Sequence, residues 1–146
     1  MIKMTSRFVF LAILFSIGFL GFSGAYGWSA GQTKYQTISA GQFAQMIDKK
    51  DFLLVNVHIP YEGEIAQTDL LIPFNQIDRY QDRLPEDKNS KIVVYCLMGP
   101  MGSIAAGTLA RMGYTQVFDL QGGMMAWQNL GKEVFNRNPE RRSSLL

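Results

Sequence analysis

The sequence has little of the chemistry that metal and redox sites need, with one cysteine and one histidine among 146 residues. A single cysteine excludes an internal disulfide, a redox pair of thiols and any zinc site built on several cysteines. The chain also has no large excess of positive or negative charge. It has 14 basic and 12 acidic residues, and 12 of each when Lys3 and Arg7 are left out. Since a basic footprint is absent, we expect no nucleic-acid partner, and we expect no metal and no cofactor.

The composition that remains is that of one small globular domain. Hydrophobic residues make up 47% of the chain and charged residues 18%, which is typical of a folded protein and not of a disordered one. The length allows one domain at most.

The N-terminus is typical of a targeting segment. Lys3 and Arg7 supply positive charge, residues 8–22 form an uncharged run of 15, and small residues follow, which is the order of regions in a secretory signal peptide. As a helix the run would span about 22 Å, short of the roughly 30 Å hydrocarbon core of a bilayer. Cleavage after Ala25 or Gly27 is one interpretation, and an uncleaved membrane anchor is the other.

Either interpretation predicts an exported protein, periplasmic or otherwise extracytoplasmic, that meets the membrane only through this segment. The expected organisation is a signal peptide or anchor at 1–27, a linker at 28–34, a domain at 35–135 and a polar tail at 136–146.

Apolar stretches alternate with helical patterns through the domain. Strands are expected at 35–38, 52–57, 91–95 and 115–119, and helices at 39–50, 75–83, 101–112 and 124–130. Residues 58–73 contain Pro60 and Gly63 and are expected to be irregular. Because strands that alternate with helices form parallel sheets, the sequence predicts an α/β fold.

Cys96 follows the expected strand 91–95 and begins a short loop that leads into a helix. Ligands bind beyond the carboxyl ends of parallel strands, and the free N–H groups of a helix start can converge on the sulfur. The helix dipole favours an anion there by about 0.3–1 kcal/mol, and by up to ~2 kcal/mol. The pattern predicts a thiolate nucleophile at Cys96; the alternative is a small buried hydrophobic residue.

Residues 113–127 read GYTQVFDLQGGMMAW, and residues 54–57 read LVNV. With these motifs, the sequence from 52 to 130 resembles a single-domain rhodanese, a sulfurtransferase-like module. The resemblance implies a three-layer α/β fold with a five-stranded parallel sheet flanked by helices. It also implies that Cys96 carries a persulfide inside a donor-binding loop, which here consists of Leu97, Met98, Gly99, Pro100, Met101 and Gly102.

The loop departs from the family pattern, because Leu97 and Met101 stand where the family usually has arginines. No lysine or arginine lies between Lys91 and Arg111, so backbone amides and the helix dipole are left to bind an anion. A charge-assisted hydrogen bond contributes roughly 1.5–3 kcal/mol, and losing two would weaken thiosulfate capture roughly 10²- to 10⁴-fold. We therefore expect a weak thiosulfate sulfurtransferase that prefers a persulfide or polysulfide donor and passes sulfur to a thiol acceptor.

Two other functions are compatible with these residues. A rhodanese fold with little turnover could present its apolar loop to a protein partner. Cys96 and the thioethers of Met98, Met101, Met124 and Met125 could bind a soft ion such as Cu(I), although methionines that line an apolar wall are the simpler interpretation.

The remaining polar residues have two interpretations each. His58 is either a hydrogen-bonded turn residue or an auxiliary cation beside the loop, and Glu62 or Glu64 could pair with it. Asp119 is interpreted as a polar strand end, and the alternative is an acid catalyst. Gly102 stands where the phosphatase relatives of this fold need an arginine, so we expect no phosphatase activity.

Overall fold

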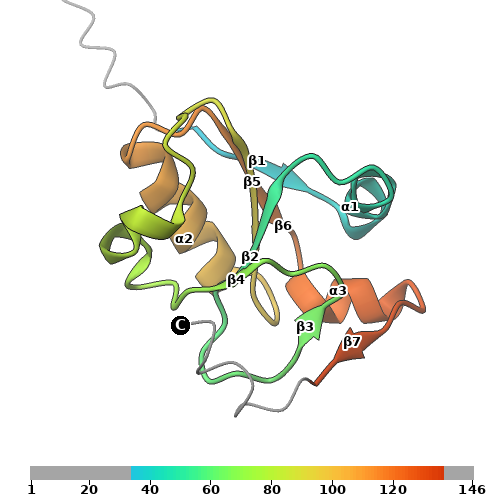
Figure 1. The fold of residues 1–146 in the computed structure, drawn as a ribbon. Coiled ribbons are helices and arrows are strands. Elements are labelled where there is room, and N and C mark those ends of the chain that lie inside the picture. The colour runs from blue at the N-terminus through green and yellow to red at the C-terminus, as the bar shows by residue number, and fades with distance from the viewer. Residues whose placement is uncertain (1–33, 137–146) are drawn as a thin grey trace, which may run out of the picture. The chain divides into compact units, whose positions relative to one another are not determined.

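A computed structural model describes residues 34–136 of this chain. They form a five-stranded parallel sheet with helices on both faces (Figure 1). Its strands, in the spatial order β1-β6-β5-β2-β4, are β1 (Gln36–Ile38), β6 (Gln116–Leu120), β5 (Lys91–Tyr95), β2 (Leu53–Asn56) and β4 (Leu70–Leu71). The expected fold class is confirmed.

The predicted targeting segment, most of the predicted linker and nearly all of the predicted tail lie outside the described residues. Within residues 34–136, no helix is both long enough and apolar enough to cross a membrane.

The helices α1 (Ala40–Ile47) and α3 (Gly123–Asn129) cover one face of the sheet, and α2 (Pro100–Arg111) covers the other (Figure 1). Ser39 caps α1 as expected, because its hydroxyl accepts from the Gln42 N–H at 3.3 Å while the Gln42 side chain accepts from the Ser39 N–H at 2.8 Å. The helix ends at Ile47, before the predicted end at residue 50.

The helix α2 begins at Pro100, before the predicted start at residue 101 or 102. Proline is well tolerated in the first helical turn, where a backbone N–H has no partner within the helix. Gly113 lies just beyond the C-cap with φ of +94°, which is the conformation expected of a glycine at this position.

Two sequence predictions are wrong in the segment between β2 and β5. Residues 58–73 contain β4, the edge strand of the sheet, and β3 (Glu64–Ile65), which pairs with β7 (Val134–Phe135) in a separate antiparallel ribbon. Strands of two residues are too short to show an alternating pattern.

The predicted helix at 75–83 is replaced by two 3₁₀ turns, η1 (Ile77–Arg79) and η2 (Gln81–Arg83). Asn75 does not cap either turn, because Gln76 and Tyr80 occupy the cap positions and neither makes a side-chain cap bond. Ile77 is the one buried residue of the two turns, so no apolar stripe holds a longer helix against the sheet.

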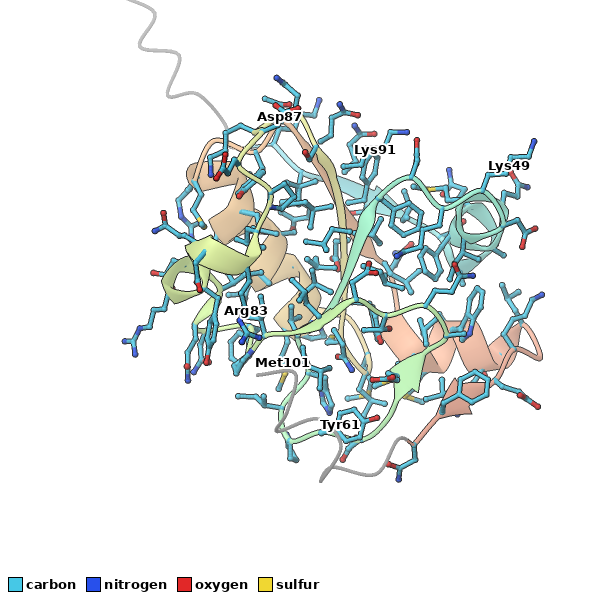
Figure 2. All side chains as sticks on the ribbon, viewed as in Figure 1. Lys49, Tyr61, Arg83, Asp87, Lys91 and Met101 are labelled. Carbon is cyan, nitrogen blue, oxygen red and sulfur yellow. The ribbon has the colours of Figure 1, made fainter. Side chains whose placement is uncertain are left out.

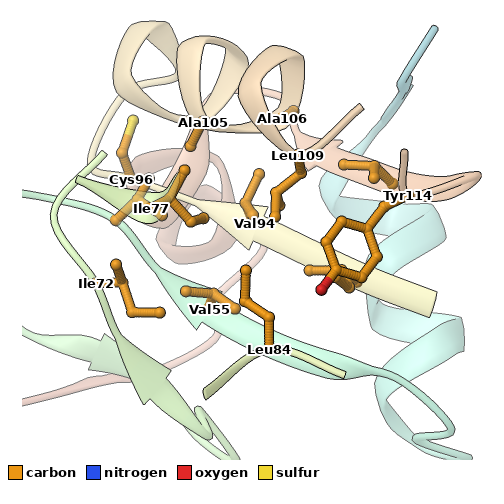
Figure 3. Close-up of a cluster of buried hydrophobic side chains, with 13 residues drawn as sticks. Val55, Ile72, Ile77, Leu84, Val94, Cys96, Ala105, Ala106, Leu109 and Tyr114 are labelled. Carbon is orange, nitrogen blue, oxygen red and sulfur yellow. The ribbon is translucent and has the colours of Figure 1, made fainter. Parts of the chain in front are cut away.

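The two faces of the sheet pack into separate apolar layers. Along β5, Ile92 and Val94 face the layer under α2, whereas Val93 and Tyr95 face the layer under α1 and α3, as the alternation of side chains along a strand requires. Cys96 belongs to the layer under α2 (Figure 3).

Candidate functional site

The loop that begins at Cys96 leaves the carboxyl edge of the sheet and is held mainly by backbone hydrogen bonds. The carbonyl of Cys96 accepts from the Met124 N–H at 2.9 Å, and the carbonyl of Leu97 accepts from the Met125 N–H at 3.0 Å. The start of α3 therefore lies against the loop. A Cβ at Gly123 would lie 2.1 Å from the Cys96 carbonyl oxygen, so no other residue fits this contact.

Cys96 is 2% exposed and packs in the layer under α2. The Gly99 N–H donates to Sγ at 2.9 Å. Gly99 has φ of +125°, a conformation that glycine adopts without strain, and this turns its amide back toward the sulfur. An amide in this position is placed to donate to a negatively charged sulfur.

The side chains of the predicted donor-binding loop form an apolar rim. Met98 is 61% exposed, and Pro100 is also exposed. Leu97 is half-buried and packs against the layer under α1 and α3, whereas Met101 is half-buried and packs against the layer under α2. Met101 lies at the same end of the sheet as Tyr61, with Lys91 at the opposite end (Figure 2).

Gly102 is buried at the start of α2, and the carboxyl group of Asp119 fills the space beside it. A Cβ at Gly102 would lie 2.3 Å from Asp119 Oδ1 and 3.8 Å from the backbone nitrogen of Cys96. Asp119 lies on β6 opposite Val94 of β5. The structure thus brings together Cys96, the first turn of α2 and a buried acid.

Asp119 lies within β6, one residue before the end of the strand, and is buried. It is 4% exposed, and within the described part of the chain its Oδ1 has no hydrogen-bond partner. Burial raises the pKa of Asp119 from 3.8 to about 6, because an apolar environment disfavours the charged form. The one sequence signal was an aspartate inside the otherwise apolar strand pattern of residues 117–120.

Of the four methionines of the predicted soft-metal site, Met101 packs against the layer that contains Cys96. Met124 is fully buried in the layer under α1 and α3, whereas Cys96 lies in the layer under α2. Met98 and Met125 are 61% and 46% exposed. Among residues 34–136, no group of three or more histidine, cysteine, aspartate and glutamate side chains is arranged to hold a metal ion.

His58 lies in a hydrogen-bonded turn after β2. Its N–H donates to Asn56 Oδ1 at 3.0 Å, and Asn56 Nδ2 donates to the Gly63 carbonyl at 2.8 Å. Its Nε2 lies 3.2 Å from Glu62 Oε2, so Glu62 is the acid that pairs with it. Glu64 is instead fully buried on β3.

A cavity of about 200 Å³ opens at the carboxyl ends of β2 and β4. Its lining is mostly apolar and consists of Asn56, His58, Ile59, Tyr61, Leu71, Ile72, Pro73 and Tyr80. The His58 side chain is 10% exposed, and its Nδ1 has no hydrogen-bond partner among the described residues. Asn56 is the register neighbour of Tyr95, the residue before Cys96, so the cavity and the cysteine lie at the same edge of the sheet.

Comparison with known proteins identifies the family. A family model described as a rhodanese-like domain matches residues 39–130. A sulfurtransferase of Allochromatium vinosum is 33% identical over 94 residues, which is 62% of this chain and 84% of that protein. A tRNA uridine(34) hydroxylase of Yersinia enterocolitica is 30% identical over 102 residues, but this chain spans only 29% of its length.

Solved structures agree with the fold. A rhodanese-related protein from Thermoplasma volcanium superposes with a TM-score of 0.59 at 26% identity, over 68% of this chain and 97% of that one. A rhodanese-like domain protein from Staphylococcus aureus superposes with a TM-score of 0.58 at 23% identity, over 69% and 99%. On the family match and the sulfurtransferase relative, this chain belongs to the family of rhodanese-like domains.

Proposed function

We propose that this chain is an exported sulfurtransferase that carries a persulfide on Cys96. The observation that carries the proposal is the Gly99 N–H, which points at Sγ from 2.9 Å at the carboxyl end of β5. The similarity to a protein named as a sulfurtransferase, at 33% identity, supports the reaction class.

The reaction has two displacements at sulfur. In the first, the Cys96 thiolate attacks the outer sulfur of the donor, the sulfur–sulfur bond of the donor breaks, and the donor leaves as a thiolate or as sulfite. In the second, an acceptor thiolate attacks the outer sulfur of the Cys96 persulfide, and Cys96 leaves as a thiolate. Amides at the start of α2 can stabilise the negative charge on sulfur in both steps.

The loop favours donors that carry little charge. Leu97, Met98 and Met101 give the cysteine loop apolar side chains, and no lysine or arginine occurs between Lys91 and Arg111. An uncharged polysulfide, or a persulfide group with a single charge, leaves less unpaired charge at this surface than thiosulfate, which carries two. We therefore rank thiosulfate as the poorer donor.

The cavity at the carboxyl ends of β2 and β4 is our candidate for the binding site of the thiol acceptor. Ile72 lines this cavity and also packs in the same apolar layer as Cys96. Its mostly apolar walls suit the organic part of a small thiol. His58, with Nε2 against Glu62, supplies a polar group there that can accept the thiol proton.

A second function, a binding module for another protein, is favoured by one observation. Met98 and Met125 are 61% and 46% exposed. The Met125 N–H donates to the carbonyl of Leu97, the residue before Met98, at 3.0 Å. Exposed methionines on one rim are typical of adaptable binding surfaces.

The experiment that separates the two functions is the intact mass of the purified chain after exposure to a donor. Thiosulfate and glutathione persulfide are tested separately, with Cys96→Ser as the control. One added sulfur atom that cyanide or a thiol removes, and that the variant never gains, establishes the sulfur carrier. If neither donor adds sulfur while Cys96 can still be alkylated, the binding module replaces the enzyme.

A further inference from the structure

The mechanism above leaves one buried ionisable group beside the reacting sulfur unused. Asp119 is 4% exposed, its Oδ1 has no partner among the described residues, and no step of sulfur transfer requires it. A buried acid without a partner costs folding free energy. Its position under the cysteine loop calls for a function that an uncharged side chain would not supply.

Gly102 lies between the Asp119 carboxyl group and the backbone of Cys96. A side chain at Gly102 would meet Asp119 Oδ1 at 2.3 Å and the Cys96 backbone nitrogen at 3.8 Å. Asp119 Oδ1 therefore lies against the first turn of α2, directly beneath the loop that begins at Cys96. Any anion drawn to that helix start meets the field of this carboxyl group as well.

Little in the surroundings neutralises this charge. At this end of β5, Tyr95 faces the other layer, under α1 and α3, and Cys96 follows the strand. Lys91 lies at the far end of β5, where it pairs with Asp51. The strand β1 carries no charged residue, and the single charge of α2 is Arg111 in its last turn. Gly122 and Gly123, which lead into the uncharged helix α3, add none.

We propose that Asp119 is a specificity-determining residue whose negative charge beneath the loop repels anionic reactants from Cys96. The discrimination depends on pH: the loop accepts anions while Asp119 is protonated and rejects them once it ionises. Burial raises the pKa of this carboxyl to about 6, so the change falls between mildly acidic and neutral pH. The identity of the natural donor rests on the proposed function, but the discrimination itself does not.

The test compares two alkylating reagents of similar size at Cys96, which is the only thiol in the chain. Iodoacetamide is neutral and iodoacetate is anionic, and the ratio of their rates cancels the fraction of thiolate present. For the wild-type chain we expect the iodoacetate-to-iodoacetamide ratio to fall roughly tenfold between pH 5 and pH 7.5, the size expected of two charges a few ångströms apart.

The Asp119→Asn variant removes the charge while nearly keeping the shape. Its ratio should be flat with pH and about tenfold above that of the wild type at pH 7.5. Asp78→Asn is the matched control, because Asp78 is an exposed acid on η1, and its profile should follow that of the wild type. The wild-type profile is informative even if the Asp119 variant does not fold.

A ratio in the wild type that does not change with pH would overturn the proposal, as would an equal change in Asp119→Asn. A Cys96 that reacts with neither reagent would also overturn it. Alkylation needs no sulfur transfer, so a chain that discriminates as expected but gains no sulfur from any donor would refute the proposed function alone. If both hold, Asp119→Asn should gain sulfur from thiosulfate about tenfold faster at pH 7.5, with no gain for an uncharged organic polysulfide.

Discussion

The acidic residues at the two ends of the parallel strands differ in burial and pairing. We call the end where the strands begin the amino edge and the end where they finish the carboxyl edge. At the amino edge, Asp69 and Asp51 are partly exposed and pair with Lys50 and Lys91, with 2.6 Å between Lys50 Nζ and Asp69 Oδ2. At the carboxyl edge, Asp119 is 4% exposed and its Oδ1 has no partner in the described residues. Exposed pairs contribute little and are easily replaced, whereas a buried unpaired acid is costly. This difference agrees with the proposal that the charge at the carboxyl edge serves the site.

The largest expected effect comes from placing cations in the cysteine loop, which has no lysine or arginine. Leu97→Arg with Met101→Arg restores two charged donors beside Cys96, and thiosulfate turnover should rise by up to roughly 10²- to 10⁴-fold. Steady-state release of sulfite measures the change, and turnover with an uncharged polysulfide serves as the internal control. A double variant no faster than the wild type would show that the missing arginines do not limit the reaction.

The next largest effect is the pH dependence of the free energy of unfolding. Because burial raises the pKa of Asp119 from 3.8 to about 6, the folded state holds the proton more tightly than the unfolded state. Protonated Asp119 contributes fully to the free energy of unfolding below pH 3.8, and this contribution is lost as the pH rises to about 6. The free energy of unfolding falls by up to roughly 3 kcal/mol, at about 1.4 kcal/mol per pKa unit. Asp119→Asn should lack this loss.

Urea unfolding of the wild type and of Asp119→Asn at pH 4 and pH 7.5 measures the difference. The variant should gain stability relative to the wild type on going to pH 7.5. Parallel pH dependence in the two proteins would mean that burial does not alter the ionisation of Asp119.

Gly102→Ala tests the contact that positions the acid. The new methyl group would lie 2.3 Å from Asp119 Oδ1, so we expect a loss of about 1–3 kcal/mol in the free energy of unfolding. Combining it with Asp119→Gly should recover part of that loss, as measured by a double-mutant cycle in urea. If the losses in the free energy of unfolding of the two variants were additive, the contact with Asp119 would not be the cause of the destabilisation by Gly102→Ala.

The smallest effects are expected at the amino edge. Asp69 also accepts from the Leu54 N–H at 2.7 Å, so Asp69→Asn should destabilise the fold by about 1 kcal/mol. Asp51→Asn removes only the exposed pair with Lys91 and should cost less than about 0.5 kcal/mol. Thermal unfolding at low and high salt distinguishes the two, since screening weakens exposed pairs most. A cost at Asp51 as large as that at Asp69 would contradict the comparison.

The local patterns of the sequence predicted most of the framework. The apolar run at 91–95 is β5, and the loop that leads from Cys96 into α2 was expected from Gly99 and the helical pattern that follows. These features depend on neighbours in the chain, so propensity and spacing are enough to reveal them. The family signature at 113–127 rests in the same way on local motifs.

The features that were missed depend on contacts between distant segments. The strands β3, β4 and β7 are each two residues long and exist because another part of the chain supplies their hydrogen-bond partners. The η1 and η2 turns lie where a helix was predicted, because one buried residue cannot hold a helix on the sheet.

The sequence by itself determined the fold class, the place of Cys96 after a buried strand and the absence of cations from its loop, because each follows from residue order. Only the tertiary structure decided the burial of Asp119 and its place beside Gly102. Parallel pairing sets β6 beside β5, and the packing of α2 sets Gly102 over the carboxyl group. Burial, which shifts the ionisation of that acid, is a property of the whole core that no local stretch of sequence contains.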